Sequence, residues 1–182
     1  GLVGENGAGK STLMKILSGV YHADEGEIFI EGQRVKIDSV AKAHELGISI
    51  IMQELNMCGH LSVADNIFIG RAHKKGIFID DAKMHQEAQK ILDDLGIDLD
   101  THTRVGDLSV AKQQMVEIAK AISFHSKILV LDEPTATLTE REIDQLFEII
   151  RRLQDKGVGM VYISHRMAEL ERICERDRKS VV

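Results

Sequence analysis

A phosphate-binding sequence near the start of the chain constrains the fold more than any other feature. It matches the pattern G-x-x-x-x-G-K-[ST] in full, and its residues are Gly4, Glu5, Asn6, Gly7, Ala8, Gly9, Lys10 and Ser11. The glycines let the backbone curl around an anion, so that successive N–H groups point at phosphate oxygens. The pattern predicts a nucleoside triphosphate site between a strand and a helix; a Gly-rich turn that only caps a helix is the alternative.

The last residues of this sequence supply charge and a metal ligand. Lys10 places a flexible ammonium on the β- and γ-phosphate oxygens, and the helix that begins here adds its positive N-terminal end. The Ser11 hydroxyl suits Mg²⁺, a hard ion that prefers oxygen ligands and shares them with phosphate. Thr12 completes the segment that we assign to nucleotide binding.

Composition narrows the class of protein without adding chemistry. The chain has 182 residues, enough for one α/β domain with a buried core. Its net charge of -6 argues against a nucleic-acid-binding face as the main function. Cys58 and Cys174 lie far apart without metal-ligand spacing, which suits a reducing cytosol. The longest apolar runs have the length of buried strands and fall far short of a bilayer span.

Helices and strands alternate along the chain. Apolar residues at helical spacing predict helices over residues 11–18, 81–95, 110–124 and about 140–154. Short apolar runs predict buried strands over residues 48–52, 128–131 and 160–163. Residues 27–32 and 34–37 alternate around a Gly-containing turn, which predicts an antiparallel hairpin.

Both ends of the chain indicate a fragment. Position 1 is Gly rather than Met, and only Leu2 and Val3 precede the phosphate-binding sequence, so most of the expected first strand is missing. Residues 175–179 are a dense charge run where an α/β pattern would place an apolar strand. We therefore expect one domain over residues 1–174 and a truncated or non-native tail over 175–182.

A second chemical motif is the apolar strand that ends in Asp132 and Glu133. We expect Asp132 to hold Mg²⁺, through water. Glu133, at the exit of the strand, can reach past the metal and polarise an attacking water, so it is the candidate general base. Apolar strands that end in Asp-Glu are also common as surface turns, and the phosphate-binding sequence upstream is what favours the catalytic interpretation.

A third sequence indicates a family. Ahead of a helix, the chain carries a segment that resembles the L-S-G-G-Q signature of ABC-transporter ATPases, and its residues are Leu108, Ser109, Val110, Ala111, Lys112 and Gln113. Gln53 ends a core strand as the family's Gln-loop glutamine does, His165 follows a strand as its switch histidine does, and residues 134–139 resemble its D-loop. Singly, Gln53 also fits a polar strand end, His165 a helix cap, and Ser109 the N-cap of its helix.

The motifs follow the family's order from Gly4 to about Cys174. The resemblance implies an α/β P-loop NTPase fold with a RecA-like core. A small antiparallel β subdomain is expected within residues 20–52, and an inserted α-helical subdomain with the signature over about 60–124. The resemblance also implies ATP hydrolysis. Its catalytic residues are then Glu133, His165 and Gln53, and its metal ligands are Ser11, Gln53 and Asp132.

Finer matches over residues 53–56, 61–71, 113–121 and 162–167 resemble the bacterial simple-sugar importers of the ribose, galactose and xylose type. In that family one polypeptide carries two ATPase halves, and this chain resembles the first. The resemblance implies an ATPase at the cytoplasmic face of the bacterial inner membrane that powers monosaccharide import. Its partners would be the second ATPase half, transmembrane permease subunits and, indirectly, a periplasmic sugar-binding protein, with no nucleic acid among them.

In ABC enzymes each nucleotide lies between the phosphate loop of one half and the signature of the other. Val110 and Ala111 replace the two signature glycines, and side chains there can hinder the approach of backbone N–H groups to a γ-phosphate. Our hypothesis is that this half supplies the competent loop, metal ligand and base, while its own signature faces a weaker site. Two other functions stay open: a soluble ABC ATPase that acts on the ribosome or DNA, and an ATP-binding module without turnover.

Overall fold

The structure, a computed structural model, describes residues 1–3, 8–76, 78–174 and 178–179. Residues 4–7 of the phosphate-binding sequence therefore lie outside the described residues. The chain divides into two compact units. The first consists of Gly1–Met52, Phe124–Glu133 and Val158–Val182, and the second of Gln53–Ser123 and Pro134–Gly157.

A parallel sheet forms the centre of the first unit. Its strands lie in the order β4 (Ile48–Ile51), β7 (Ile128–Asp132), β8 (Gly159–Ile163), β1 (Leu2–Val3) and β9 (Arg178–Lys179). The predicted strands over 48–52, 128–131 and 160–163 are confirmed. Parallel strands are covered on both faces, which explains why β7 reads as an unbroken apolar run. The carboxyl ends of β7 and β8 meet at one edge, where Asp132 pairs with Ile163.

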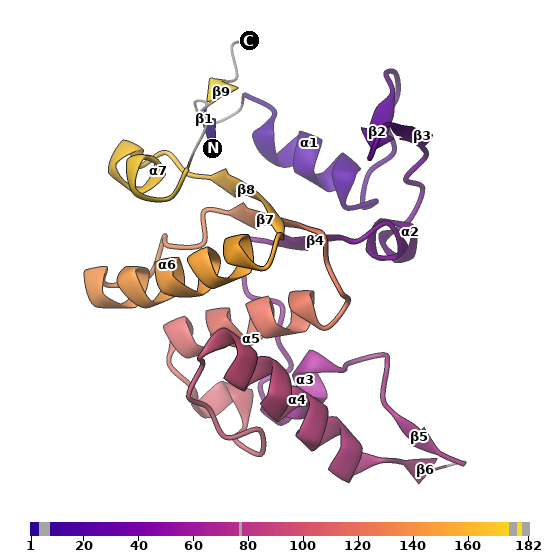
Figure 1. Ribbon diagram of the computed structural model, residues 1–182, viewed down its shortest axis with the longest axis vertical. Coiled ribbons are helices and arrows are strands. Elements are labelled where there is room, and N and C mark those ends of the chain that lie inside the picture. Colours follow the sequence, from indigo (N-terminus) through magenta and orange to yellow (C-terminus); the bar gives the residue numbers. More distant parts are fainter. Residues whose placement is uncertain (4–7, 77, 175–177, 180–182) are drawn as a thin grey trace. The chain divides into compact units, whose positions relative to one another are not determined.

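Helix α1 (Lys10–Leu17) packs against this sheet (Figure 1). Its Met14 is buried in a cluster with Val130 and Ile163, and Leu17 packs against the same cluster, whereas Leu13 is exposed. The helix follows Gly9, whose φ of +81° lies in the left-handed region that glycine adopts without strain. The tight turn into α1 thus depends on a glycine of the phosphate-binding sequence.

The predicted antiparallel hairpin is confirmed as β2 (Ile28–Ile30) and β3 (Gln33–Val35). It packs, with α2 (Val40–Glu45), on a cluster of buried apolar residues beside β4: Ile37, Ala43 and Ile48. Strand β8 is followed by α7 (Met167–Ile173), which buries Leu170 and Ile173. Residues 178–179, within the charged tail, form β9 and pair with β1.

Helices dominate the second unit. They are α3 (Val63–Ile67), α4 (Asp81–Leu95), α5 (Val110–Ile122) and α6 (Glu140–Asp155), with a short hairpin of β5 (Lys74–Lys75) and β6 (Phe78–Ile79). Helices α3, α4 and α5 pack against one another (Figure 1). The predicted helix over 81–95 is confirmed, while α5 ends two residues before the predicted 124 because Ser123 is its C-cap. Within the described part of the chain, no helix combines the length and apolar character needed to cross a membrane.

Candidate active site

The structure brings together two residues of the expected metal site that are far apart in the sequence. The Ser11 hydroxyl, in the first turn of α1, donates a hydrogen bond of 3.2 Å to the Asp132 Oδ2 atom at the end of β7. Among the described residues, no three His, Cys, Asp or Glu side chains gather into a metal-binding group. Mg²⁺ bound with nucleotide phosphates needs only one or two protein oxygens, so a hydroxyl beside one carboxylate fits that ion.

Asp132 is a buried carboxylate, with 9% of its surface exposed. Burial raises the pKa of Asp132 above its ordinary value, the Ser11 hydrogen bond lowers it, and the charge of the adjacent Glu133 raises it again; the net direction is upward. The positive charge of Lys10, a residue with 8% of its surface exposed, also lowers this pKa. A buried carboxylate with incomplete compensation gains from a bound cation.

We expect Asp132→Asn to raise the free energy of unfolding of the nucleotide-free chain at neutral pH by roughly 1 kcal/mol. The amide carries no charge to desolvate, and its oxygen still accepts from Ser11. Because the pKa of Asp132 is higher in the folded than in the unfolded state, its ionisation lowers the free energy of unfolding of the wild type as the pH rises between the two values. The stability advantage of Asp132→Asn over the wild type should therefore grow from acid to neutral pH. Urea unfolding of both chains across that range measures the difference.

The exposed Asp98 offers the matched control, because surface substitutions rarely change stability by more than about 0.5 kcal/mol. Asp98→Asn should therefore leave unfolding nearly unchanged at every pH. A constant difference between wild type and Asp132→Asn from acid to neutral pH would contradict the raised pKa.

The proposed base and the proposed switch histidine contact each other. The His165 Nδ1 atom lies 3.0 Å from the Glu133 Oε1 atom, with the two side chains 62% and 17% exposed respectively. The Glu133 backbone N–H donates to the Ile163 carbonyl oxygen at 2.9 Å, which ties the exit of β7 to the end of β8. His165 does not cap α7, since the N-cap of that helix is Arg166.

Glu133 adopts an unusual backbone conformation. Its φ is +47°, in the left-handed region where a residue with a Cβ atom costs roughly 1 to 2 kcal/mol more than in the right-handed one. Such residues occur preferentially at functional sites, because the surrounding structure has to hold them there. The conformation agrees with a role for Glu133 that goes beyond a surface turn.

Other residues expected at the site have no contact with Ser11, Asp132, Glu133 or His165 described for them. Gln53 is exposed just after β4 and belongs to the second compact unit, so its catalytic and metal-binding roles stay predictions. Thr12 is exposed on α1, next to Ser11. Of the phosphate-binding glycines, only Gly9 lies in the described part of the chain.

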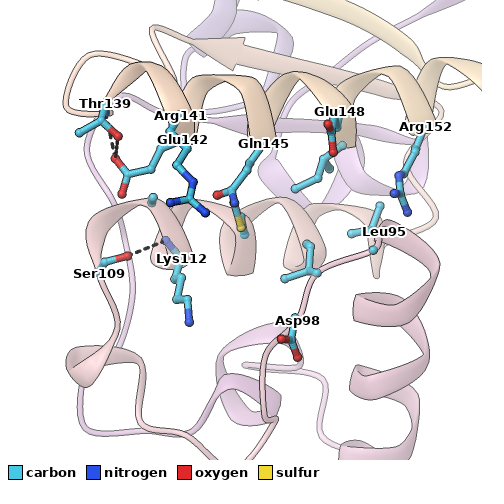
Figure 2. A pocket seen from close by; sticks show the side chains of 15 residues that line it. Leu95, Asp98, Ser109, Lys112, Thr139, Arg141, Glu142, Gln145, Glu148 and Arg152 are labelled. Atoms are coloured by element: carbon cyan, nitrogen blue, oxygen red, sulfur yellow. Dashed lines mark hydrogen bonds between the residues drawn. The ribbon is translucent and has the colours of Figure 1, made fainter.

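The signature segment forms the start of α5. The Ser109 hydroxyl caps the helix by accepting from the Lys112 backbone N–H at 3.4 Å, and the Gln113 side chain donates to the Leu108 carbonyl oxygen at 3.0 Å. Figure 2 shows Ser109 and Lys112 at one end of a pocket of about 520 Å³ that α6 completes within the second unit. Ser109 is thus the N-cap of α5, as the alternative interpretation expected, and it is exposed.

The two residues that replace the signature glycines differ in exposure. Val110 is 46% exposed, whereas the Ala111 methyl group is buried, with 4% of the residue exposed. Of the two residues that replace the glycines, only Val110 therefore presents an exposed side chain. The expectation that these side chains hinder the approach of a nucleotide stays a prediction, and the exposure favours Val110 as the side chain that does so.

Sequence reasoning missed a buried polar network directly beside His165. The Glu169 carboxylate, on α7, accepts hydrogen bonds from the side chains of Tyr162, Ser164 and Arg166. The only sequence signal was the run of polar residues Ser164, His165 and Arg166 followed by Glu169, and such a run is too common to indicate a site.

A phosphate-binding helix whose serine meets the aspartate at the end of a buried parallel strand defines a P-loop nucleotide-binding protein. The chain belongs to the ABC transporter family, whose model matches residues 1–136. A crystal structure of an ATP-binding cassette of an ABC transporter in its ADP conformation is similar, with a TM-score of 0.81 and 27% identity over 94% of this chain and 72% of that one. The expected fold class is confirmed.

Relatives resemble the chain over nearly its whole length. A putative ribose/galactose/methyl galactoside import ATP-binding protein of Albidiferax ferrireducens is 55% identical over 177 residues, which cover 96% of this chain and 35% of that protein. The galactose/methyl galactoside import ATP-binding protein MglA of Escherichia coli is 51% identical over 174 residues, 96% of this chain and 34% of that protein. The chain thus spans about a third of the length of the curated relatives that it matches.

Proposed function

We propose that the chain is the first ATPase half of a subunit that binds and hydrolyses ATP to power import of a monosaccharide. The observation that carries the proposal is the meeting of Ser11, Asp132, Glu133 and His165 at the carboxyl ends of β7 and β8, beside the buried Lys10. The relatives described above support the sugar-import assignment, since their names specify import of ribose, galactose or methyl galactoside.

The residues divide the chemistry of hydrolysis among them. In this proposal residues 4–12 hold the ATP phosphates, while Ser11, Asp132 and Gln53 hold Mg²⁺, which would neutralise charge on the phosphate oxygens. Glu133 accepts the proton of the attacking water as general base. His165, which lies against the Glu133 carboxylate, orients that carboxylate and senses the γ-phosphate.

The remaining roles belong to the larger assembly. We infer a second ATPase half that completes the nucleotide site, and transmembrane permease subunits that receive the closing motion through residues 55–71. A periplasmic sugar-binding protein delivers the cargo to the permease, and the ATPase lies at the cytoplasmic face of the bacterial inner membrane. The domain extends over residues 1–174 in this proposal. The signature faces a weaker site, because Val110 stands where close backbone approach calls for glycine.

ATP turnover per chain, measured against protein concentration, tests the enzymatic part of the proposal. Lys10→Ala serves as the blank, and the second ATPase half is added in a parallel series. We expect faster turnover with the second half than with the chain paired to itself. Equal rates would refute the weaker signature. No turnover in either series, with Mg-ATP binding retained, would instead indicate an ATP-binding module.

A further inference from the structure

A buried glutamate lies beside the exposed histidine of the active site. Glu169 is 5% exposed and occupies the first turn of α7. Its Oε2 atom accepts hydrogen bonds from the Tyr162 hydroxyl at 3.0 Å and from the Ser164 hydroxyl at 3.1 Å, and its Oε1 atom accepts from the Arg166 guanidinium at 2.9 Å. None of these residues has a part in the chemistry described so far.

The contacts of Glu169 flank His165 on both sides along the chain. Ser164 precedes the histidine, is 2% exposed, and also accepts a hydrogen bond of 3.0 Å from the Arg166 backbone N–H. Arg166 follows the histidine and forms its ion pair with Glu169. The carboxylate therefore holds the residue before and the residue after His165 in one network with the end of β8.

Packing of its own side chain does not fix the position of His165. The imidazole is 62% exposed, so its reach to Glu133 depends on the backbone that carries it. Buried hydrogen bonds to a charged group are shorter and stronger than neutral ones, and a buried carboxylate is tolerated only with such partners. The hydrogen bonds of Glu169 can therefore hold rigid the backbone that carries the exposed imidazole of His165.

We propose that Glu169 is a positioning residue for His165: through Ser164 and Arg166 it holds the turn after β8 so that the imidazole meets Glu133. The inference rests on the proposed function, in which His165 serves hydrolysis. Glu169 itself touches neither nucleotide nor water in this scheme. A buried polar group that only stabilised the fold would have the same contacts, so the test must separate the two roles.

The test is a double-mutant cycle between Glu169 and His165, with turnover measured on the full chain together with the second ATPase half. Glu169→Gln keeps the shape of the side chain and removes the charge that pairs with Arg166. We expect kcat to fall by roughly 10-fold or more, since small misplacements of catalytic groups cost about that much, while KM for ATP changes little. In a His165→Ala background the same substitution should have no further effect. An unchanged kcat, or equal losses in both backgrounds, would overturn the proposal.

A second readout does not depend on activity. The imidazole NMR resonances of His165 are assigned by their loss in His165→Ala. Their chemical shifts should change in Glu169→Gln, while those of His85, which belongs to the second unit, should stay the same. If Glu169→Gln does not fold, Tyr162→Phe removes one of the donors to the same carboxylate and should shift the same resonances. Resonances of His165 that stay unchanged in the folded variant would exclude a positioning role.

Controls separate this inference from the proposed function. Ser49→Ala breaks a buried hydroxyl pair of 2.6 Å with Ser126 in the same unit, remote in the sequence from His165, and should lower thermal stability without changing kcat. Failure of wild type to exceed the Lys10→Ala blank would count against the ATPase function itself. Active wild type with an unaffected Glu169→Gln would leave that function standing and remove only the positioning role.

Discussion

Glu133→Gln is expected to lower ATP turnover by a factor of about 10² to 10⁴, the usual contribution of a positioned general base. The amide keeps the size of the side chain but cannot accept the proton of the attacking water. Binding of ATP should persist, because the phosphate-binding residues are untouched. Single-turnover hydrolysis and a direct binding measurement, made on the same preparation, distinguish the two steps.

The matched control for the loss of one carboxylate is Glu45→Gln. Glu45 forms a surface ion pair of 2.9 Å with Lys42 on α2, and pairs of this kind contribute little. Its replacement should leave turnover and nucleotide affinity unchanged. Turnover by Glu133→Gln close to that of wild type would remove Glu133 from the role of base, whatever its contact with His165.

Lys10→Ala should weaken nucleotide binding itself. A hydrogen bond to a charged group contributes about 1.5 to 3 kcal/mol, which corresponds to a rise in the dissociation constant of roughly 10- to 150-fold. Lys10 is buried, with 8% of the residue exposed, and directly precedes Ser11, which meets Asp132. Equilibrium titration with a fluorescent ATP analogue in the presence of Mg²⁺ measures the change.

Lys42→Ala is the control for removal of a lysine charge, since Lys42 contacts only Glu45 among the ion pairs described for it. Its nucleotide affinity should match that of wild type. Equal weakening in both variants would indicate a general effect of net charge, and unchanged affinity in Lys10→Ala would contradict the phosphate-binding role of the loop.

The parts of the fold that the sequence predicted are those determined locally. Residues 128–131 are apolar without interruption because a central parallel strand is buried on both faces, and β7 lies where that run occurs. Apolar residues at helical spacing predict the helix over 81–95, and α4 has these bounds because Asp80 caps its start and Gly96, with a φ of +70°, ends it. Local signals of this kind need no knowledge of distant residues.

The details that escaped prediction depend on contacts between distant segments. No spacing in the sequence indicates that His165 lies against Glu133, because this contact arises only when β7 and β8 pair. The burial of Glu169 with Tyr162 depends on how α7 packs after β8, which the sequence pattern does not indicate either. The burial of Ala111 beside the exposed Val110 follows from which face of α5 meets its neighbours. Composition cannot distinguish these two positions.

The strand order of the first unit also governs how the protein can fold during synthesis. Leu2 of β1 pairs with Ile163 of β8, and Ser11 of α1 meets Asp132 of β7 across 121 residues, so these segments acquire their partners only after β7 and β8 have been made. Helices α3, α4 and α5 contact one another within a shorter stretch and can be ordered earlier. A nascent chain that stops before β8 leaves the backbone groups along one edge of β7 unpaired, and unpaired strand edges of this kind favour aggregation.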